Sequence, residues 1–287
     1  MKLSISQAPI QARADTESKL ERYLSIKIAN VYNDLLQNVL NDEINKIDFW
    51  NTYCQKIDLQ ISAQQTNENE YLENTLGARY SNLKSYFNID FDGRKLLLDS
   101  EEKVKDIILE FIQLLIKREL AFIGKIELQT CKSCKTPIAT QNVNIIKCKN
   151  CGGINFELVK SEQMLLDVEK LFEINAEKIN EIFANKPWIK SFFNTLPRHQ
   201  IISKKRFRGI SVETFGLSEQ LKIDPKIILA LQSLLYSEIY GTELIGVVQG
   251  IDSIKNTFPL SVILDPTFKA KIISVPMIPE LKNSGIK

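Results

Sequence analysis

Histidine is nearly absent from this sequence, which has one such residue, His199, among 287. A single imidazole excludes every mechanism that needs two, including zinc catalysis by paired histidines. Glycine is scarce as well, with 11 residues, and neither a GxGxxG nor a GxxxxGK[ST] phosphate-binding loop occurs. The two common nucleotide-binding fingerprints are therefore excluded.

Long apolar runs and an excess of one charge are also missing. No window approaches the ~18 consecutive apolar residues that a membrane-spanning helix requires. The N-terminal residues lack the apolar segment and the small-residue cleavage site of a signal peptide. We therefore expect a cytoplasmic protein with no membrane partner. The formal net charge is only +2, which argues against strong electrostatic binding of nucleic acid.

Basic residues nevertheless gather in one short run, which contains Lys204, Lys205, Arg206 and Arg208 around Phe207. A run of this kind is usually a solvated surface and only sometimes a set of phosphate contacts. We keep the four basic residues as candidate contacts to nucleic acid.

Hydrophobic periodicity predicts an α/β protein. Apolar residues at three- and four-residue steps predict a long helix that begins after Asp15 or Thr16 as the capping residue, and a second helix over 101–120. Further helices are predicted near 71–86, 162–172, 177–184 and 225–237, and strands at 2–5, 57–61, 243–248 and 271–275. Strands that alternate with helices indicate a largely parallel sheet.

Four of the five cysteines form two CxxC pairs with thirteen residues between them: Cys131, Cys134, Cys148 and Cys151. Two such turns direct four thiolates at one centre, and this tetrahedral set of soft ligands suits zinc. Disulfides are the alternative, which a cytoplasmic location disfavours. Because the protein supplies all four ligands, the predicted zinc is structural. The fifth, Cys54, is either a small buried residue or a reactive thiol.

The region around these cysteines resembles the zinc-bearing segment of class I aminoacyl-tRNA synthetases, in the subgroup that charges methionine, leucine, isoleucine and valine. Leu120, Ala121 and Phe122 lead into the first CxxC pair as in that family, and residues 162–166 match its EQ-x-F-L strand. The family also has an R-D-x-x-I-S-R-x-x-x-W-G-I-P stretch, which is matched here by Arg198, Ile202, Ser203, Gly209 and Ile210. Its G-x-D turn, which contacts the nucleotide ribose, is matched by Gly250 and Asp252.

The resemblance implies a Rossmann-like, class I synthetase-type parallel sheet with helices on both faces and an inserted zinc knuckle. Residues 1–125 would form the first half of the core with a helical connecting segment. Residues 126–160 would form the knuckle, and residues 161–287 the second half of the core. We expect no anticodon-binding or editing domain.

The sequence departs from the family at its catalytic signatures. Where the family has His-x-Gly-His, this chain has Thr16 to Lys19, and it has no second histidine elsewhere. Those imidazoles stabilise the phosphates of ATP, so ordinary amino-acid activation should be nearly abolished. The second signature, Lys-Met-Ser-Lys-Ser, has its candidate at residues 281–284. The resemblance implies two candidate catalytic residues, Lys19 and Lys282, and six candidate residues for a ligand or nucleotide: Gln7, Thr16, Lys19, Gly250, Asp252 and Ser284.

Three functions follow as hypotheses. The first is a synthetase-like protein that no longer charges tRNA and binds a small or amino-acid-like ligand, as an accessory or regulatory subunit of a partner protein. The second is an ATP-dependent aminoacyl ligase or transferase that acts on a small-molecule acceptor. The third is a module that holds the acceptor end of tRNA with the zinc knuckle and the basic run. Structural zinc is common to all three, whereas ATP is required only by the second.

Overall fold

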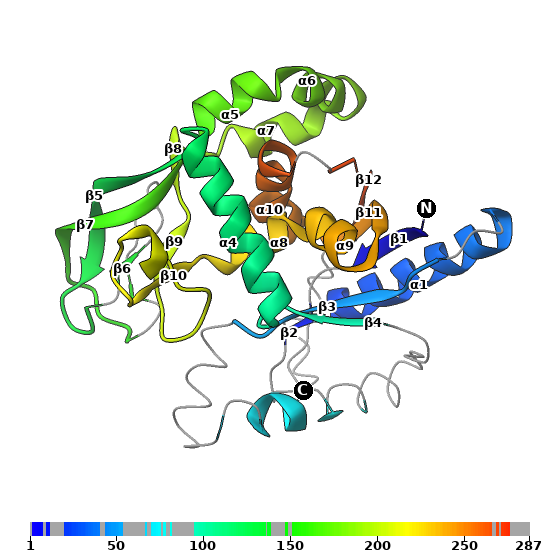
Figure 1. Cartoon of the computed structure of the whole chain (residues 1–287), viewed down its shortest axis with the longest axis horizontal. Coiled ribbons are helices and arrows are strands. Elements are labelled where there is room, and N and C mark those ends of the chain that lie inside the picture. The colour runs from blue at the N-terminus through cyan, green and yellow to red at the C-terminus, as the bar shows by residue number, and fades with distance from the viewer. Residues whose placement is uncertain are drawn as a thin grey trace. The chain divides into compact units, whose positions relative to one another are not determined.

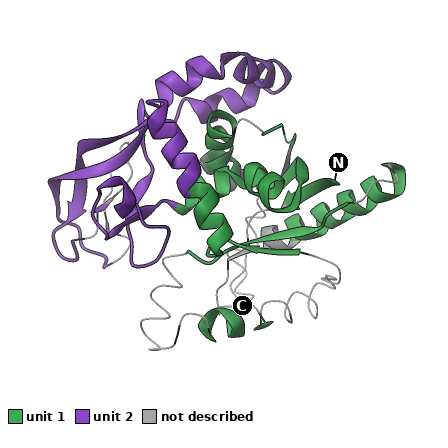
Figure 2. Ribbon diagram, in the orientation of Figure 1, with its two compact units in different colours: residues 1–108, 225–287 green, residues 109–224 purple. Residues whose placement is uncertain are grey.

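The computed structural model describes residues 2–7, 10–11, 20–40, 44–53, 67, 70–75, 77–78, 81, 95–135, 137–138, 147–148, 151–265, 268–269 and 271–275. They belong to two compact units (Figure 2). Unit 1 consists of residues 1–108 and 225–287, and unit 2 of residues 109–224. Strands and helices mix throughout the chain, as predicted (Figure 1).

Within the described residues, every strand of unit 1 is parallel to its neighbours: β1 (Lys2–Gln7), β2 (Ile10–Gln11), β3 (Ile47–Asn51), β4 (Lys95–Leu98), β11 (Thr242–Gly250) and β12 (Lys271–Val275). A parallel bridge between Leu3 and Ile44 joins the β1-β11-β12 group to the β2-β3-β4 group. The resulting order is β4-β3-β1-β11-β12, which is the strand order of a Rossmann sheet. The order reverses between β1 and β11.

Helices cover both faces of this sheet. Along the chain, α1 (Leu20–Leu40) lies between β1 and β3, and α10 (Ile251–Leu264) lies between β11 and β12. These two connections run in opposite directions across the sheet, so right-handed crossovers place the two helices on opposite faces. Ala29 of α1 packs against Ile5 and Val248. Two further helices in the second half of the unit are α8 (Pro225–Ala230) and α9 (Gln232–Tyr240), where a single helix to residue 237 was predicted.

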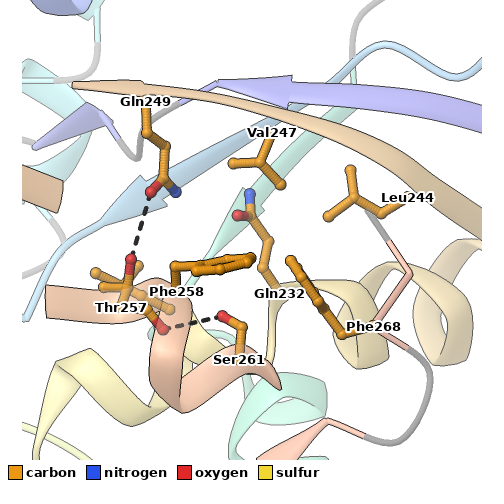
Figure 3. A pocket seen from close by; sticks show the side chains of 9 residues that line it. Gln232, Leu244, Val247, Gln249, Thr257, Phe258, Ser261 and Phe268 are labelled. Atoms are coloured by element: carbon orange, nitrogen blue, oxygen red, sulfur yellow. Dashed lines mark hydrogen bonds between the residues drawn. The ribbon is translucent and has the colours of Figure 1, made fainter. Parts of the chain in front are cut away.

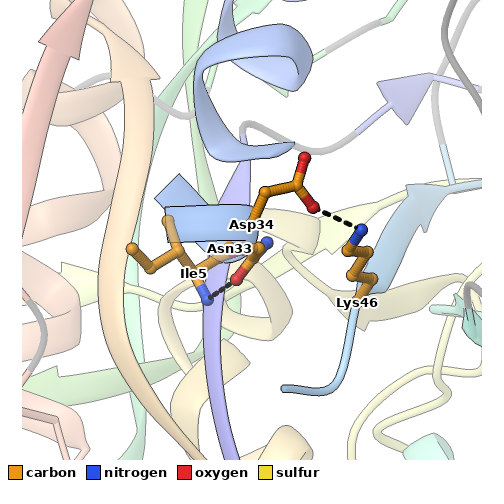
Figure 4. Close-up of polar contacts among 4 residues, drawn as sticks. All are labelled: Ile5, Asn33, Asp34 and Lys46. Atoms are coloured by element: carbon orange, nitrogen blue, oxygen red, sulfur yellow. Dashed lines mark hydrogen bonds and ion pairs between the residues drawn. The ribbon is translucent and has the colours of Figure 1, made fainter. Parts of the chain in front are cut away.

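A side-chain amide of α1 completes the hydrogen bonding of β1. The N–H of Ile5 donates to Asn33 Oδ1 at 2.9 Å, and Asn33 Nδ2 donates to the Ile5 carbonyl at 2.9 Å (Figure 4). Two residues earlier, on the same edge of the strand, the Leu3 carbonyl accepts from Asn45 N at 3.0 Å. Asn33 therefore takes the place of a neighbouring strand at Ile5.

Unit 2 is built on one long antiparallel pair, β5 (Ala121–Cys131) and β7 (Phe156–Asp167), in register from Ala121↔Leu166 to Cys131↔Phe156. Two shorter strands flank this pair, β6 (Pro137–Ile138) beside β5 and β8 (His199–Ile201) beside β7. A separate two-stranded ladder follows, formed by β9 (Ser203–Lys205) and β10 (Leu221–Ile223). The helix α4 (Glu102–Lys117) enters this unit at residue 109. The other helices are α5 (Val168–Ile174), α6 (Ala176–Asn185), α7 (Lys190–Phe193) and the 3₁₀ turns η1 (Pro187–Ile189) and η2 (Glu213–Phe215). The predicted knuckle of residues 126–160 lies inside this larger unit, because its flanking strands pair along their full length.

The predictions for regular structure fail where a strand is buried on both sides. The helix predicted near 162–172 is wrong in its first half, because β7 continues to Asp167 and α5 begins at Val168. Leu165 pairs with β5 on one side and with β8 on the other. A continuous apolar run has no two-residue alternation, so periodicity does not separate it from a helix. The strand β3 was not predicted either: it is buried at all five residues, and its buried polar residues Asp48 and Asn51 interrupt the apolar pattern.

Several other predictions are confirmed: the helices at 101–120 (α4, Glu102–Lys117) and 177–184, and the strands at 2–5, 243–248 and 271–275. The strand predicted at 57–61 and most of the helix predicted at 71–86 lie outside the described residues, although residues 70–75 are helical. No helix in the described part of the chain is long and apolar enough to cross a membrane.

We predict that Asn33→Ala destabilises unit 1 by about 2–4 kcal/mol, because it leaves a buried N–H and a buried carbonyl of Ile5 without partners. The matched control is Asp34→Ala. Asp34 is the next residue of α1 and its surface ion pair with Lys46, at 2.6 Å, should contribute less than about 1 kcal/mol. Urea unfolding followed by circular dichroism measures both changes. Equal losses of unfolding free energy in the two variants would contradict the role given to Asn33.

Candidate metal centre and ligand site

The four predicted cysteine ligands converge in unit 2. Their sulfur atoms all lie within 4.8 Å of one another. The Sγ atoms of Cys131 and Cys151 are 3.5 Å apart, and those of Cys134 and Cys148 are 3.7 Å apart. In a tetrahedral site with zinc–sulfur bonds of ~2.3 Å, neighbouring sulfurs lie ~3.8 Å apart. The cluster therefore fits a single metal ion such as zinc.

Two similar turns bring the sulfurs together. The N–H of Lys135 donates to the Cys131 carbonyl at 2.8 Å, and the N–H of Gly152 donates to the Cys148 carbonyl at 2.9 Å. Each turn ends in a residue with positive φ, 55° at Lys135 and 77° at Gly152. Glycine adopts this conformation without strain, which accounts for Gly152 in the second turn.

Gly153 leaves room for the sulfur atoms. Its N–H donates to Cys151 Sγ at 3.4 Å. A Cβ atom at this position would lie 2.9 Å from Ser133 Oγ and within 3.3 and 3.4 Å of the sulfurs of Cys131 and Cys151. A larger residue would displace the Ser133 hydroxyl and crowd the Cys131 sulfur, so glycine is favoured here by close approach rather than by its φ angle.

The pKa values of the cysteine thiols also favour a bound cation among the four sulfur atoms. A backbone hydrogen bond from Cys134 holds the pKa of the Cys131 thiol below its ordinary value. The Gly153 amide acts in the same direction on Cys151, but hydrogen bonds with the thiols of Cys134 and Cys131 raise the pKa of Cys151 to about 12. Neighbouring thiols cannot all ionise unless a positive charge lies between them. A bound divalent metal supplies that charge and displaces the protons.

The second candidate site lies at the carboxyl edge of the parallel sheet in unit 1. Gln7 ends β1 in register with Val248, and Gly250 ends β11 two residues later. Gly250 is also the N-cap of α10, and Asp252 is the second residue of that helix. Ligands of such sheets bind outside the carboxyl ends of the strands, where the strand order reverses. The other candidates, Thr16, Lys19, Lys282 and Ser284, lie outside the described residues.

A hollow adjoins β11 on the face that carries α9 and α10 (Figure 3). Its cavity volume is about 10 Å³, which is room for about one water molecule. Uncharged side chains line it throughout: Leu229, Gln232, Leu244, Val247, Gln249, Thr257, Phe258, Ser261 and Phe268. Thr257 Oγ1 donates to Gln249 Oε1 at 3.3 Å, and Ser261 Oγ donates to the Thr257 carbonyl at 3.1 Å.

A buried polar network holds one wall of this hollow. Gln232 Nε2 donates to Ser6 Oγ at 2.6 Å and to the Tyr236 hydroxyl at 2.9 Å. The Tyr236 hydroxyl in turn donates to the Ile47 carbonyl at 3.4 Å. These residues were not predicted from the sequence. Their one signal in the sequence is the polar pair Gln232 and Ser233, which interrupts the apolar run between α8 and Tyr236.

The predicted basic run lies on β9 and the turn that follows it. Lys205 is exposed, Lys204 and Arg206 are half-buried, and Arg208 is only 6% exposed. The single histidine, His199, lies on β8 and packs edge-on against Phe122, with 5.2 Å between the ring centroids. This contact supports a structural role for the imidazole.

We predict one zinc ion per purified chain, measured by inductively coupled plasma mass spectrometry. Cys148→Ser should lose this zinc, because a buried tetrahedral site does not tolerate a hard oxygen ligand in place of a thiolate. The control is Cys54→Ser, which changes the one cysteine outside the cluster and should keep the metal. After zinc removal and denaturation, a thiol titration of the wild-type chain should detect all five cysteines. Fewer thiols, because some cysteines form disulfides, would contradict the metal site.

Gly153→Ala should weaken zinc binding by about 10–100-fold in competition with a chelator, because the added methyl displaces two ligand sulfurs. Gly77→Ala is the matched control, since a Cβ at that helical position meets no atom within 4 Å. An unchanged zinc affinity in Gly153→Ala would show that the cluster tolerates the side chain, contrary to the geometry.

No protein-family model matches the sequence, and no curated protein matches it significantly. Among solved structures, a Mycobacterium tuberculosis methionyl-tRNA synthetase in complex with methionyl-adenylate is similar, with a TM-score of 0.65 and 10% sequence identity. A second structure of the M. tuberculosis enzyme, bound by methionyl-adenylate, gives a TM-score of 0.64 and 10% identity. Both alignments cover 96% of this chain and 57% of the synthetase, so the chain spans little more than half of that protein's length. The chain therefore has a class I synthetase-like fold.

Proposed function

We propose that unit 1 binds a small, amino-acid-like ligand at the carboxyl edge of its parallel sheet, and that the chain is a synthetase-like protein without ordinary tRNA-charging activity. The observation that carries this proposal is the reversal of strand order between β1 and β11. This reversal brings the ends of both strands, Gln7 and Gly250, to the edge at which such sheets bind ligands.

The hollow beside β11 indicates the chemistry of the ligand. None of its nine lining side chains is charged. The hollow has room for only about one water molecule, so the ligand itself would lie at the edge of the sheet. A charged group directed at the hollow would lose hydration without gaining an ionic partner, which favours an uncharged group on that side of the ligand. Gln249 and Thr257 offer hydrogen-bonding groups among apolar neighbours. The methionyl-adenylate held by the M. tuberculosis enzyme has an uncharged amino-acid side chain, which supports an uncharged side chain as the apolar end of the ligand.

The sequence argues against ordinary activation of an amino acid by ATP. A class I synthetase uses two histidines on the phosphates, and this chain has one histidine, which packs against Phe122 in unit 2. Loss of one such transition-state donor costs ~2.7–4 kcal/mol in comparable sites. Because both histidines of the signature are missing, we propose a role in binding, as an accessory or regulatory subunit. The zinc in unit 2 would be structural.

An assay of ATP–pyrophosphate exchange, run with each of the twenty amino acids, tests the loss of activation. We expect no exchange above background with any of them, because two phosphate-stabilising imidazoles are missing. Amino-acid-dependent exchange would contradict this part of the proposal. It would instead support an ATP-dependent ligase that acts on a small-molecule acceptor, in which Lys19 or Lys282 replaces the histidines, and a Lys19→Ala variant would then lose the exchange.

A further inference from the structure

The second half of helix α1 exposes an apolar face. Val31, Leu35 and Val39 follow one another at four-residue steps, and Tyr32 lies beside them on the same side of the helix. Their exposed fractions are 57%, 52%, 76% and 41%, in that order. When a helix packs against a sheet, its far side normally carries charged and polar residues. Four large apolar side chains together in this position therefore require an explanation, unlike single scattered ones.

The opposite side of α1 is fixed to the sheet, so the apolar face points away from it. Ile26 and Ala29 are almost completely buried, and the Asn33 amide forms its two bonds to Ile5. Two residues that are two positions apart in a helix lie about 200° apart around its axis. Leu35 is therefore directed outward because Asn33 is directed into the sheet.

The exposed face carries no ionised side chain. Between residues 28 and 40 the one charged residue is Asp34, which lies beside the face and pairs with Lys46 at 2.6 Å (Figure 4). The polar residues next to the apolar ones are two exposed amides, Gln37 and Asn38. An amide has both a donor and an acceptor, so it can bond to another copy of itself, which an ionised carboxylate or an ammonium group cannot do. The face thus suits a second copy of the chain and offers nothing to a charged partner.

We infer that this face joins two copies of the chain in a two-fold symmetric, antiparallel helix pair centred on Leu35. A two-fold contact uses the same patch on both copies, so the patch must match its own reverse. Across an axis beside Leu35, Val31 of one copy lies at the level of Val39 of the other. Tyr32 likewise lies at the level of Asn38. Ridges of residues at four-residue steps pack into one another at a crossing angle of about −50°, the commonest arrangement of two helices.

The size of the face suits a reversible dimer. With the flanking amides, two copies would bury on the order of 1,000 Å², close to the lower limit of about 1,200 Å² for stable interfaces. An amphipathic helix of another protein would meet the same apolar ridge, but it would have no use for the symmetry of the ridge about Leu35.

The dimer face is separate from the proposed ligand site. The chain leaves β1 at the carboxyl edge of the sheet, and α1 runs back along the sheet to Ile44, which bridges to Leu3 near the start of β1. The second half of α1 therefore lies toward the amino edge, whereas the proposed ligand binds at the carboxyl edge.

Sedimentation velocity of the full chain between about 1 and 200 µM tests this inference. The wild type should pass from monomer to dimer with a Kd of about 1–100 µM and grow no further, because a two-fold contact is closed. Leu35→Asp should raise this Kd by about 100-fold or more, since it brings two carboxylates together at the axis. A wild type that stays monomeric over this range or assembles beyond the dimer would overturn the inference, and so would an unchanged Kd in Leu35→Asp.

A charge exchange tests the antiparallel pairing. Val31→Glu and Val39→Lys should each weaken the dimer, because each puts a charge into an apolar contact. The double variant should regain dimerisation, because the new carboxylate of each copy lies at the level of the new ammonium group of the other. Within one chain the two positions are about 12 Å apart along the helix, too far to pair with each other. A double variant that dimerises no better than either single variant would overturn the antiparallel pairing.

The control is Ile174→Glu, which changes an exposed apolar residue at the end of α5 in unit 2 and should leave the Kd of the dimer unchanged. Circular dichroism confirms that each variant is folded. Leu35→Asp should bind an amino acid in unit 1 as well as the wild type does, which separates the outcome for the dimer from that of the proposed function.

Discussion

The amide of Asn33 is the contact on which the parallel sheet of unit 1 depends. It supplies both hydrogen bonds that a neighbouring strand would have given to Ile5, and it fastens α1 to the centre of the sheet. The next residue, Ser6, points to the opposite face, where its hydroxyl joins Gln232 and Tyr236. Helices on the two faces therefore fix consecutive residues of β1, just before the strand reaches the edge where the order of the sheet reverses.

Unit 2 depends on a different constraint, the charge of four neighbouring thiols. Their separations suit a tetrahedral metal site, but the sulfurs cannot all lose their protons without a cation among them. The two turns and Gly153 fix the ligands, and the long β5–β7 pair positions the turns. The same pair holds β9 through Ser203, so the basic run rests on the strand that follows the cysteines.

The sequence was informative where spacing alone determines geometry. The two CxxC pairs predicted the cluster, and helical periodicity predicted α1, α4 and α6, because both patterns depend on residues close in the chain. Strands buried on both faces were missed or misread. The second half of β7 is an apolar run without alternation, and β3 buries the polar residues Asp48 and Asn51 among apolar ones. The hollow was missed because Gln232, Gln249 and Thr257 come from three elements that only the folded sheet brings together.

The fold is that of a class I synthetase core, whereas the chemistry of this chain must follow from its own residues. The single histidine packs against Phe122 in unit 2, and the lack of a second imidazole favours binding over activation. Isothermal titration calorimetry of the purified chain against the twenty amino acids tests this account most directly. The account predicts saturable binding, with one site per chain, of an amino acid with an uncharged side chain and without ATP. Binding of none of them, or a preference for a charged one, would contradict it.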